Sequence, residues 1–306
     1  MTKIAFMFPG QGSMEAGMGR EVAEAVPEAM AVYDAASDAA DMDLKELCFH
    51  RPVEDLVDTE VQQPALVTTS LALDAALRSR GIRPHVVVGH SVGEFSALGA
   101  ADSLTVHDAV ALVRARGIAM AEAAKAHPGS MAAILGLADE AVEALCRKIA
   151  NVWPANYNCP GQLVISGETP SVDEACEEAA REGARRAVKL RVSGAFHSPL
   201  VARAAEALRP AVEKVHIAES GAAFMSTVTA KVEAAQHYRE LLIDQLTAPV
   251  RFTQAARELV AEGVTTFVEV GPGNVLSGLL KRIDRSVRTF SVNDLKSLDE
   301  ATEALG

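Results

Sequence analysis

A serine stands at the centre of Gly89-His90-Ser91-Val92-Gly93, which has the G-x-S-x-G spacing of a nucleophile elbow. The apolar run 85–89 leads into it and a helical pattern follows from Glu94, which is the context that such an elbow needs. Ser91 would then be exposed at the carboxyl edge of a sheet, where the amide of Val92 could bind an oxyanion. The structural alternative is a glycine-lined turn with a capping serine.

The serine needs a general base, and the chain has eight histidines. His197 is set apart because it lies in the loop Ser193-Gly194-Ala195-Phe196-His197-Ser198-Pro199, between a strand pattern and a helix that Pro199 helps to start. His90 adjoins the serine, but we expect it to point to the opposite side of the turn. The sequence therefore predicts a Ser91–His197 pair, against the alternative that His197 only begins a helix.

Four further features bear on the chemistry. Between residues 91 and 197 no Asp or Glu stands in an evident strand-end loop, which counts against a plain esterase. Arg116 lies on a mostly apolar helix, where it either extends to solvent or meets a buried anion. Gln11 follows the first strand and could offer a second oxyanion amide, unless its turn is only structural. A dinucleotide-binding turn is disfavoured because Glu15 replaces its third glycine.

The elements that position these residues follow from hydrophobic periodicity. Short apolar runs alternate with amphipathic stretches, which predicts an α/β fold. The expected strands are 3–8, 85–89, 131–135, 152–156, 162–167, 187–190, 223–226, 266–270 and 288–291. The expected helices are 27–38, 64–80, 94–101, 105–124, 139–149, 171–182, 199–214, 238–246, 252–262 and 275–283.

One segment has a different order of elements. Residues 130–190 show the order strand, helix, strand, strand, helix, strand, with a tight turn at 158–161, which is the ferredoxin-like unit. We expect it to be a small domain inserted into the larger α/β domain, with joints near 125–129 and 193–194. A cleft between two domains is a common place for a ligand.

Composition excludes several classes of protein. The 306 residues contain 29 Lys plus Arg against 41 Asp plus Glu, a net charge of −12, with 4% aromatic residues, which disfavours nucleic acid as a partner. No apolar run approaches the length of a membrane span and no signal peptide is evident, so we expect a cytoplasmic protein without membrane contact. The four cysteines lack zinc-ligand or disulfide spacing, so no metal site is predicted.

With these residues in view, the chain resembles the malonyl-CoA:acyl carrier protein transacylases, especially the free-standing bacterial type and also the acyltransferase domains of polyketide synthases. The resemblance covers nearly the whole chain in seven segments that keep the family's order. They are FPGQGS at 8–13, GHSVGE at 89–94, RARG ending at 117, NYNCPGQLVISG at 156–167, SGAFHSPL at 193–200, QLTAPVRF at 245–252 and VEVGPGNVLSGLLKRI at 268–283.

The resemblance implies an α/β-hydrolase-like catalytic domain of residues 1–126 and 194–306 with a ferredoxin-like domain of residues 127–193. It implies Ser91 as the nucleophile, His197 as its base, and the backbone amides of Gln11 and Val92 as the oxyanion hole. Gln245 would help to hold the site, because backbone or amide acceptors orient the histidine in this family in place of a carboxylate.

The resemblance also implies the substrate contacts. Arg116 would pair with the free carboxylate of malonate, and Phe196 would leave little room for an α-methyl branch. Asn156 would line the cleft near the thioester arm. Two positions depart from the family, since Val92 replaces a common Leu and Phe95 a common Tyr.

The implied activity is ping-pong transfer of malonyl from malonyl-CoA, through a malonyl-serine, to the phosphopantetheine thiol of an acyl carrier protein. It would supply extender units for fatty acid or polyketide synthesis, with no bound cofactor and as a monomer. Docking of an acidic carrier would need a local basic patch, for which the candidates are Arg185, Arg186, Lys189 and Arg191, or Lys281, Arg282 and Arg285. The alternatives are an acyl-thioester hydrolase on the same scaffold and a non-catalytic docking protein.

Overall fold

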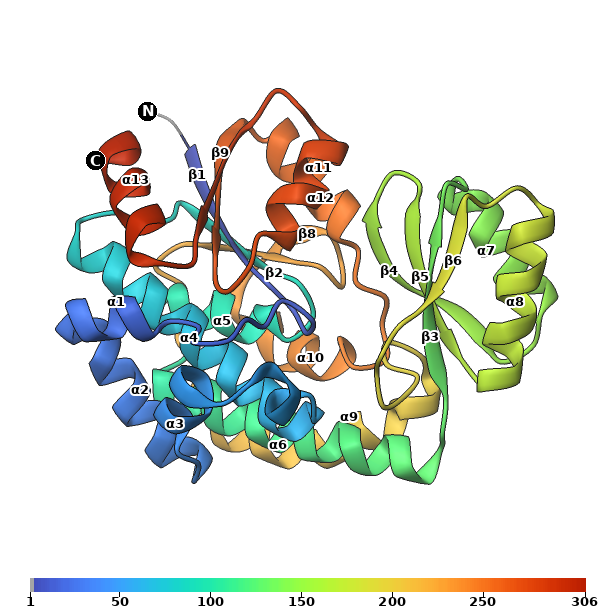
Figure 1. Ribbon diagram of the computed structural model, residues 1–306, viewed down its shortest axis with the longest axis horizontal. Helices are drawn as coiled ribbons and strands as arrows, with labels where there is room; N and C mark the ends of the chain where they lie inside the picture. The colour runs from blue at the N-terminus through green and yellow to red at the C-terminus, as the bar shows by residue number, and fades with distance from the viewer. Residues whose placement is uncertain (1–2) are drawn as a thin grey trace.

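The computed structural model describes residues 3–306 and consists of a larger and a smaller body, each built on its own β-sheet (Figure 1). The strands are β1 Lys3–Phe8, β2 Val86–Gly89, β3 Ser130–Leu135, β4 Val152–Cys159, β5 Gln162–Gly167, β6 Arg186–Lys189, β7 Ala223–Ser226, β8 Lys231–Glu233, β9 Val264–Val270 and β10 Arg288–Val292. The helices are α1 Arg20–Ala25, α2 Pro27–Ala40, α3 Leu44–His50, α4 Thr59–Ser79, α5 Gly93–Ala100, α6 Val106–Ala126, α7 Asp139–Lys148, α8 Thr169–Arg181, α9 Ala202–Lys214, α10 Ala235–Asp244, α11 Phe252–Ala261, α12 Val275–Ile283 and α13 Leu295–Leu305, with 3₁₀ turns at η1 Val53–Leu56 and η2 Pro199–Val201.

The larger sheet places its strands in the order β10-β9-β1-β2-β7-β8. The first five of these are parallel to their neighbours, and β8 is antiparallel to β7. Phe8 at the end of β1 pairs with Gly89 at the end of β2. The loops after both strands, which carry Gln11 and Ser91, therefore start side by side at the carboxyl edge, where open α/β sheets bind their ligands.

Both faces of the larger sheet are apolar, as a parallel sheet covered by helices requires. In β1, Phe6 and Phe8 belong to one core cluster, which also contains side chains of α2, α4 and α6. Ala5 and Met7 belong to the opposite cluster with α11 and α12. Figure 1 shows the two groups of helices on the two sides of this sheet. The period of two in β1 thus builds both cores.

The smaller sheet has the order β4-β5-β3-β6 and is antiparallel throughout. In β3, Ala132 and Ile134 pack with α7 and α8, whereas Met131 and Ala133 belong to the core cluster of the larger body. The smaller sheet therefore turns one face to its own helices and the other toward the larger body. The predicted α/β class with an inserted ferredoxin-like unit is confirmed.

Helix α4 differs from the prediction, which began it at Pro64. The helix begins at Thr59 and contains Pro64 in its interior. A proline there leaves the carbonyl four residues earlier without its helical partner. In this chain Arg114 from α6 donates from Nη1 to the oxygen of Glu60 at 2.8 Å and so satisfies that carbonyl. A contact from a distant helix makes the early start possible, and no local pattern reveals it.

Four helices and strands were not predicted, namely α1, α3, β8 and α13, and neither was the 3₁₀ turn η1. Each presents few buried side chains, and α13 buries only Leu298 and Ala301. Its start is nevertheless well encoded, because Asp294 and Ser297 form a reciprocal capping box.

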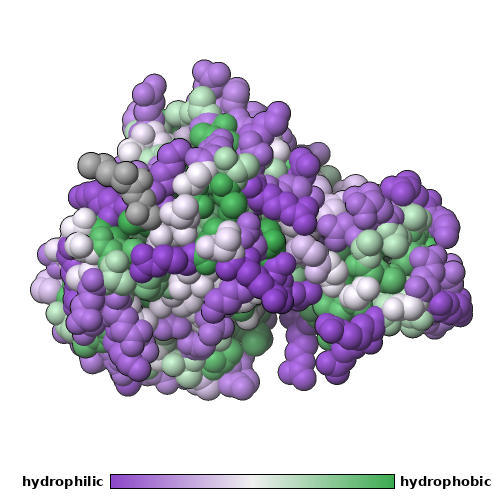
Figure 2. Space-filling model, turned by 90° about the horizontal axis from the view of Figure 1, so that it is seen from above, coloured by the Kyte–Doolittle hydropathy of each residue, from purple (hydrophilic) through white to green (hydrophobic). Residues whose placement is uncertain are grey.

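The visible surface in Figure 2 is mostly hydrophilic, with apolar residues scattered among polar ones and a notch between the larger and smaller bodies. Within the described range 3–306, no helix has the length and apolar character to span a membrane.

Candidate active site

Ser91 occupies a sharp turn between β2 and α5. Its φ of 54° is a left-handed conformation, which costs energy for a residue with a side chain. The flanking glycines are required by close packing, because a Cβ at Gly89 would overlap the amide of Glu94 and one at Gly93 would overlap the carbonyl of Phe8. The sequence G-x-S-x-G thus forms a strained elbow that lifts the serine above the sheet edge.

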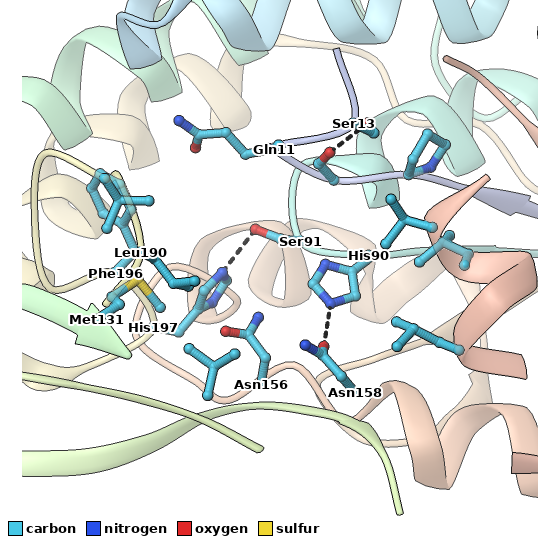
Figure 3. A pocket seen from close by; sticks show the side chains of 18 of the residues that line it. Gln11, Ser13, His90, Ser91, Met131, Asn156, Asn158, Leu190, Phe196 and His197 are labelled. Atoms are coloured by element: carbon cyan, nitrogen blue, oxygen red, sulfur yellow. Dashed lines mark hydrogen bonds between the residues drawn. The ribbon is translucent and has the colours of Figure 1, made fainter. Parts of the chain in front are cut away.

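The structure brings Ser91 and His197 together, as the sequence predicts. Ser91 Oγ lies 2.8 Å from His197 Nε2 (Figure 3). The other ring nitrogen, Nδ1, faces two backbone oxygens, that of Gln245 at 2.8 Å and that of Ala248 at 3.1 Å. Since carbonyl oxygens only accept, Nδ1 must carry the proton, and Nε2 is left to accept the serine proton. Two carbonyls therefore set the tautomer that an acid sets in other serine enzymes.

His197 is kept neutral by its surroundings. Burial lowers its pKa to about 3, and the nearby Arg116 and His90 act in the same direction. A neutral imidazole at ordinary pH has a free lone pair for the serine proton.

Arg116 lies directly behind the serine. Its side chain is buried, with 1% of the residue exposed, so the alternative of extension to solvent is excluded. Its Nη2 donates to Ser91 Oγ and to Gln245 Oε1, both at 3.1 Å, and its Nη1 donates to Gln63 Oε1 at 2.8 Å. Burial lowers the pKa of Arg116 to about 9. The hydroxyl oxygen of Ser91 therefore touches a desolvated cation whose hydrogen-bond partners are all neutral.

The guanidinium group also lies 5.9 Å from the ring centroid of Phe95, one of the two positions that depart from the family pattern. The ring is fully buried and forms an apolar wall beside the cation.

Glu94 is a buried carboxylate that the sequence analysis did not single out as a site residue. Its Oε1 accepts from the amide of Thr227 at 2.6 Å, from Thr227 Oγ1 at 2.9 Å and from Ser226 Oγ at 3.2 Å. Its Oε2 accepts from Gln245 Nε2 at 3.0 Å. Burial raises its pKa to about 7. The available signal was an acid between the elbow and the mostly apolar stretch FSALGA at 95–100.

A cavity of about 190 Å³ opens onto the serine and is lined from both bodies. Of the predicted site residues, Gln11, Ser91, Asn156, Phe196 and His197 line it, whereas Arg116, Val92 and Gln245 are buried and are not among its lining residues. In Figure 3, Phe196, Met131 and Leu190 gather on the side of His197, and His90 and Asn158 lie on the other side.

The two predicted oxyanion donors lie at the same sheet edge. Gln11 lines the cavity, and its side chain points away from Ser91 and donates from Nε2 to Thr59 Oγ1 at 2.7 Å (Figure 3). Val92 is the N-cap residue of α5. Within residues 3–306, neither backbone amide donates to another protein group. Both are therefore available to a developing oxyanion.

His90 takes no part in the serine–histidine contact. Its Nε2 lies 2.9 Å from Oδ1 of Asn158, which joins the elbow to β4 of the smaller body. The edge of β4 also pairs with the loop at Val250, where the amides of Val250 and Tyr157 donate to Ala155 and Val250. That loop supplies the Ala248 oxygen to His197, so the smaller body helps to hold the His197 ring in place.

The geometry suits one kind of chemistry. A strained serine with a neutral histidine and two free amides can attack a carbonyl carbon and hold the resulting oxyanion. The cation behind the serine adds a place for an anionic group on the acyl chain. In the part of the chain that the structure describes, no three His, Cys, Asp or Glu side chains are arranged to hold a metal ion.

Comparison with known proteins finds acyl transferases that match this chain over nearly its full length. The acyl transferase domain family matches residues 5–298. The malonyl CoA-acyl carrier protein transacylase of Bacillus subtilis is 45% identical over 310 residues, covering 100% of this chain and 98% of the relative. The malonyl-CoA:acyl carrier protein transacylase structure from Xanthomonas oryzae has a TM-score of 0.96 and 40% identity, covering 100% of this chain and 99% of that one. A malonyl-transacylase in complex with its type II PKS acyl-carrier protein gives 0.95 and 37%, covering 99% and 100%.

Proposed function

The chain belongs to the family of acyl transferase domains, and we propose that it transfers the malonyl group of malonyl-CoA to the phosphopantetheine thiol of an acyl carrier protein. The transfer supplies extender units for fatty acid or polyketide synthesis. The observation that carries this function is Arg116, a buried cation that contacts the nucleophile and has only neutral hydrogen-bond partners. A free carboxylate on the acyl group is the partner that such a cation lacks.

In the first half-reaction Ser91 Oγ attacks the thioester carbon while its proton passes to His197 Nε2. The negative oxygen of the tetrahedral intermediate accepts hydrogen bonds from the amides of Gln11 and Val92. The carbon–sulfur bond then breaks, and coenzyme A leaves as a thiol with the proton from Nε2. Malonyl remains as an ester on Ser91.

In the second half-reaction the carrier thiol gives its proton to His197 Nε2 and its sulfur attacks the ester carbon. The same two amides hold the oxyanion. The carbon–oxygen bond to Ser91 breaks, and the serine recovers its proton from the imidazole. No bound cofactor is needed, because the thioester itself is the activated acyl donor.

Substrate selection is assigned to the residues behind and beside the serine. The malonyl carboxylate lies one methylene beyond the ester carbonyl, so it can fold back to the Arg116 Nη2 donor, which is 3.1 Å from Oγ. Phe196, which is 3% exposed, narrows the cavity wall beside the acyl group and disfavours a methyl branch. Asn156 lines the cavity from β4 and offers its amide to the thioester arm.

The carrier docks next to α12 in this proposal. The helix lines the cavity with Leu276 and Leu279 and carries exposed Lys281 in its last turn, about 9 Å along the axis from its first residue. Arg285 follows just after the helix and is also exposed. At the alternative patch on β6, Lys189 is paired with Asp173, which reduces its attraction for an acidic partner.

The hydrolase alternative is not favoured. An editing hydrolase for simple acyl groups has no use for a buried carboxylate-binding cation, and the relatives of known name are transacylases. The test is incubation with malonyl-CoA and a phosphopantetheinylated carrier, followed by intact mass measurement of both proteins. Malonyl on the carrier is the expected result, whereas free malonate with an unmodified carrier would support the hydrolase.

We further propose that the enzyme acts as a monomer in the cytoplasm. One chain supplies every residue used above, and its four cysteines are unpaired, as is usual in a reducing compartment. Light scattering after gel filtration should give the mass of a single chain; twice that mass would contradict the monomer.

A further inference from the structure

Glu94 is the buried carboxylate of the active-site cluster, and the reaction above does not use it. It follows the elbow on α5, is fully buried, and faces the side-chain amide of Gln245. Burying a carboxylate is costly unless it is well bonded, and here it accepts four hydrogen bonds. Because burial of a carboxylate beside Ser91 costs free energy, we expect Glu94 to have a role in the site.

The hydrogen bonds between Glu94 and the nucleophile have a fixed direction. A carboxylate only accepts, so the amide nitrogen of Gln245 must donate to Glu94. Gln245 must then turn its oxygen to Arg116, whose Nη2 donates to it at 3.1 Å. The same nitrogen of Arg116 donates to Ser91 Oγ. Arg116 can only donate and ionised Glu94 can only accept, so the two together fix which end of the Gln245 amide meets the guanidinium.

The amide also separates two charges. Glu94 favours the charged form of Arg116 and opposes part of the effect of burial on its pKa. A carboxylate in direct contact with the guanidinium would form a bidentate pair and occupy the donors that an acyl carboxylate needs. With Gln245 between them, the cation is compensated at a distance and its nitrogen beside the serine stays available.

We propose that Glu94 is a positioning residue for acyl-group selection, which acts through Gln245 to hold Arg116 charged, oriented and unpaired for the malonyl carboxylate. The proposal rests on the proposed function, because it presumes that Arg116 binds this carboxylate. It assigns Glu94 no contact with substrate and no proton transfer.

Two variants and one control test this role. Glu94→Gln removes the charge and the acceptor-only character while it keeps the shape. The double variant Glu94→Gln/Gln245→Glu contains the same two side chains with their places exchanged, so the carboxylate now touches Arg116. The control is Glu269→Gln, another fully buried glutamate, which accepts from the amides of Leu276 and Ser277.

The readout is rapid-quench acylation of Ser91 by malonyl-CoA and, separately, by acetyl-CoA, which lacks the carboxylate. We expect Glu94→Gln to raise the half-saturating malonyl-CoA concentration by about tenfold, the equivalent of one weakened charged hydrogen bond. The maximal rate with malonyl-CoA and the acetyl-CoA kinetics should change by less than about twofold. The exchanged variant should lose at least as much malonyl preference, because the carboxylate introduced at position 245 competes for Arg116.

A wild-type malonyl-to-acetyl ratio in both variants would overturn the proposal, as would a parallel loss of both activities with the ratio kept. If Glu94→Gln does not fold, the exchanged variant, which retains one buried carboxylate, decides alone. Glu269→Gln should leave the ratio unchanged. The variant Arg116→Lys distinguishes failure of the proposed function from failure of the Glu94 role. If the malonyl-to-acetyl ratio of Arg116→Lys is also that of the wild type, the proposed carboxylate-binding function fails. If Arg116→Lys changes this ratio and the two Glu94 variants do not, only the role of Glu94 is refuted.

Discussion

Replacing Arg116 with lysine tests how the enzyme recognises an acyl carboxylate. The guanidinium donates from two terminal nitrogens, to Gln63 at 2.8 Å and to Ser91 and Gln245 at 3.1 Å. A lysine keeps the charge but has one compact ammonium group, which cannot span these partners or bind a carboxylate with two parallel hydrogen bonds. The variant therefore separates the charge from the geometry.

The expected size of the effect follows from the lost contacts. Hydrogen bonds to a charged group contribute about 1.5–3 kcal/mol each, and about 1.4 kcal/mol corresponds to a factor of ten. Loss of one of two such bonds to the malonyl carboxylate should lower kcat/KM for malonyl-CoA by about ten- to a hundredfold. Acetyl-CoA makes no such bond, so its kcat/KM should change by less than about threefold.

The assay is single-turnover acylation followed by intact mass measurement, with both thioesters at matched concentrations. Arg114→Lys is the matched control, since Arg114 lies on the same helix and donates to a backbone carbonyl of α4. An unchanged malonyl-to-acetyl ratio in Arg116→Lys would refute the carboxylate role. Equal losses for both thioesters would assign Arg116 to the serine alone.

Three further predictions concern the base, the elbow and carrier docking. Because His197 must be neutral to act and burial lowers its pKa from 6.5 to about 3, the maximal acylation rate, measured at saturating malonyl-CoA after a rapid pH jump, should hold down to about pH 5 and fall toward pH 3; a midpoint near 6.5 would contradict this. Gly93→Ala should lower the free energy of unfolding in denaturant by about 1–3 kcal/mol or more, whereas Gly278→Ala, with no atom within 4 Å of the added Cβ, should not; equal effects would contradict the packing argument. Lys281→Glu with Arg285→Glu should raise the KM for the carrier several-fold and leave that for malonyl-CoA unchanged, while equal shifts in both steady-state values would rule out docking there.

Local sequence was sufficient to predict that Ser91 and His197 lie together, while their roles as nucleophile and base stay a prediction. The elbow at Ser91 is recognised from the five residues 89–93 together with the strand directly before them and the helix directly after them, and all of these are local features of the sequence. His197 was distinguished by its loop rather than by a partner, and the structure places its ring against that serine. Arg116 was singled out as a cation on an apolar helix, but only packing shows that it is buried.

Other residues could not be found in this way because their roles depend on distant contacts. Glu94, Gln63 and the carbonyl of Ala248 meet the site through partners 51 to 151 positions away, which no local pattern encodes. Helix α4 shows the same limit, since Arg114 satisfies the carbonyl that Pro64 leaves free. The domain boundaries at 126/127 and 193/194 stay a prediction.

The proposed malonyl-serine intermediate is tested by locating the acyl group on the protein. The protein is mixed briefly with malonyl-CoA, quenched in acid, digested and mapped by mass spectrometry, alongside Ser91→Ala. We expect one malonyl ester on the peptide that carries Ser91, its absence in the variant, and its loss when a phosphopantetheinylated carrier is added before the quench. A malonyl group on another residue, or an undiminished adduct in Ser91→Ala, would contradict the proposal.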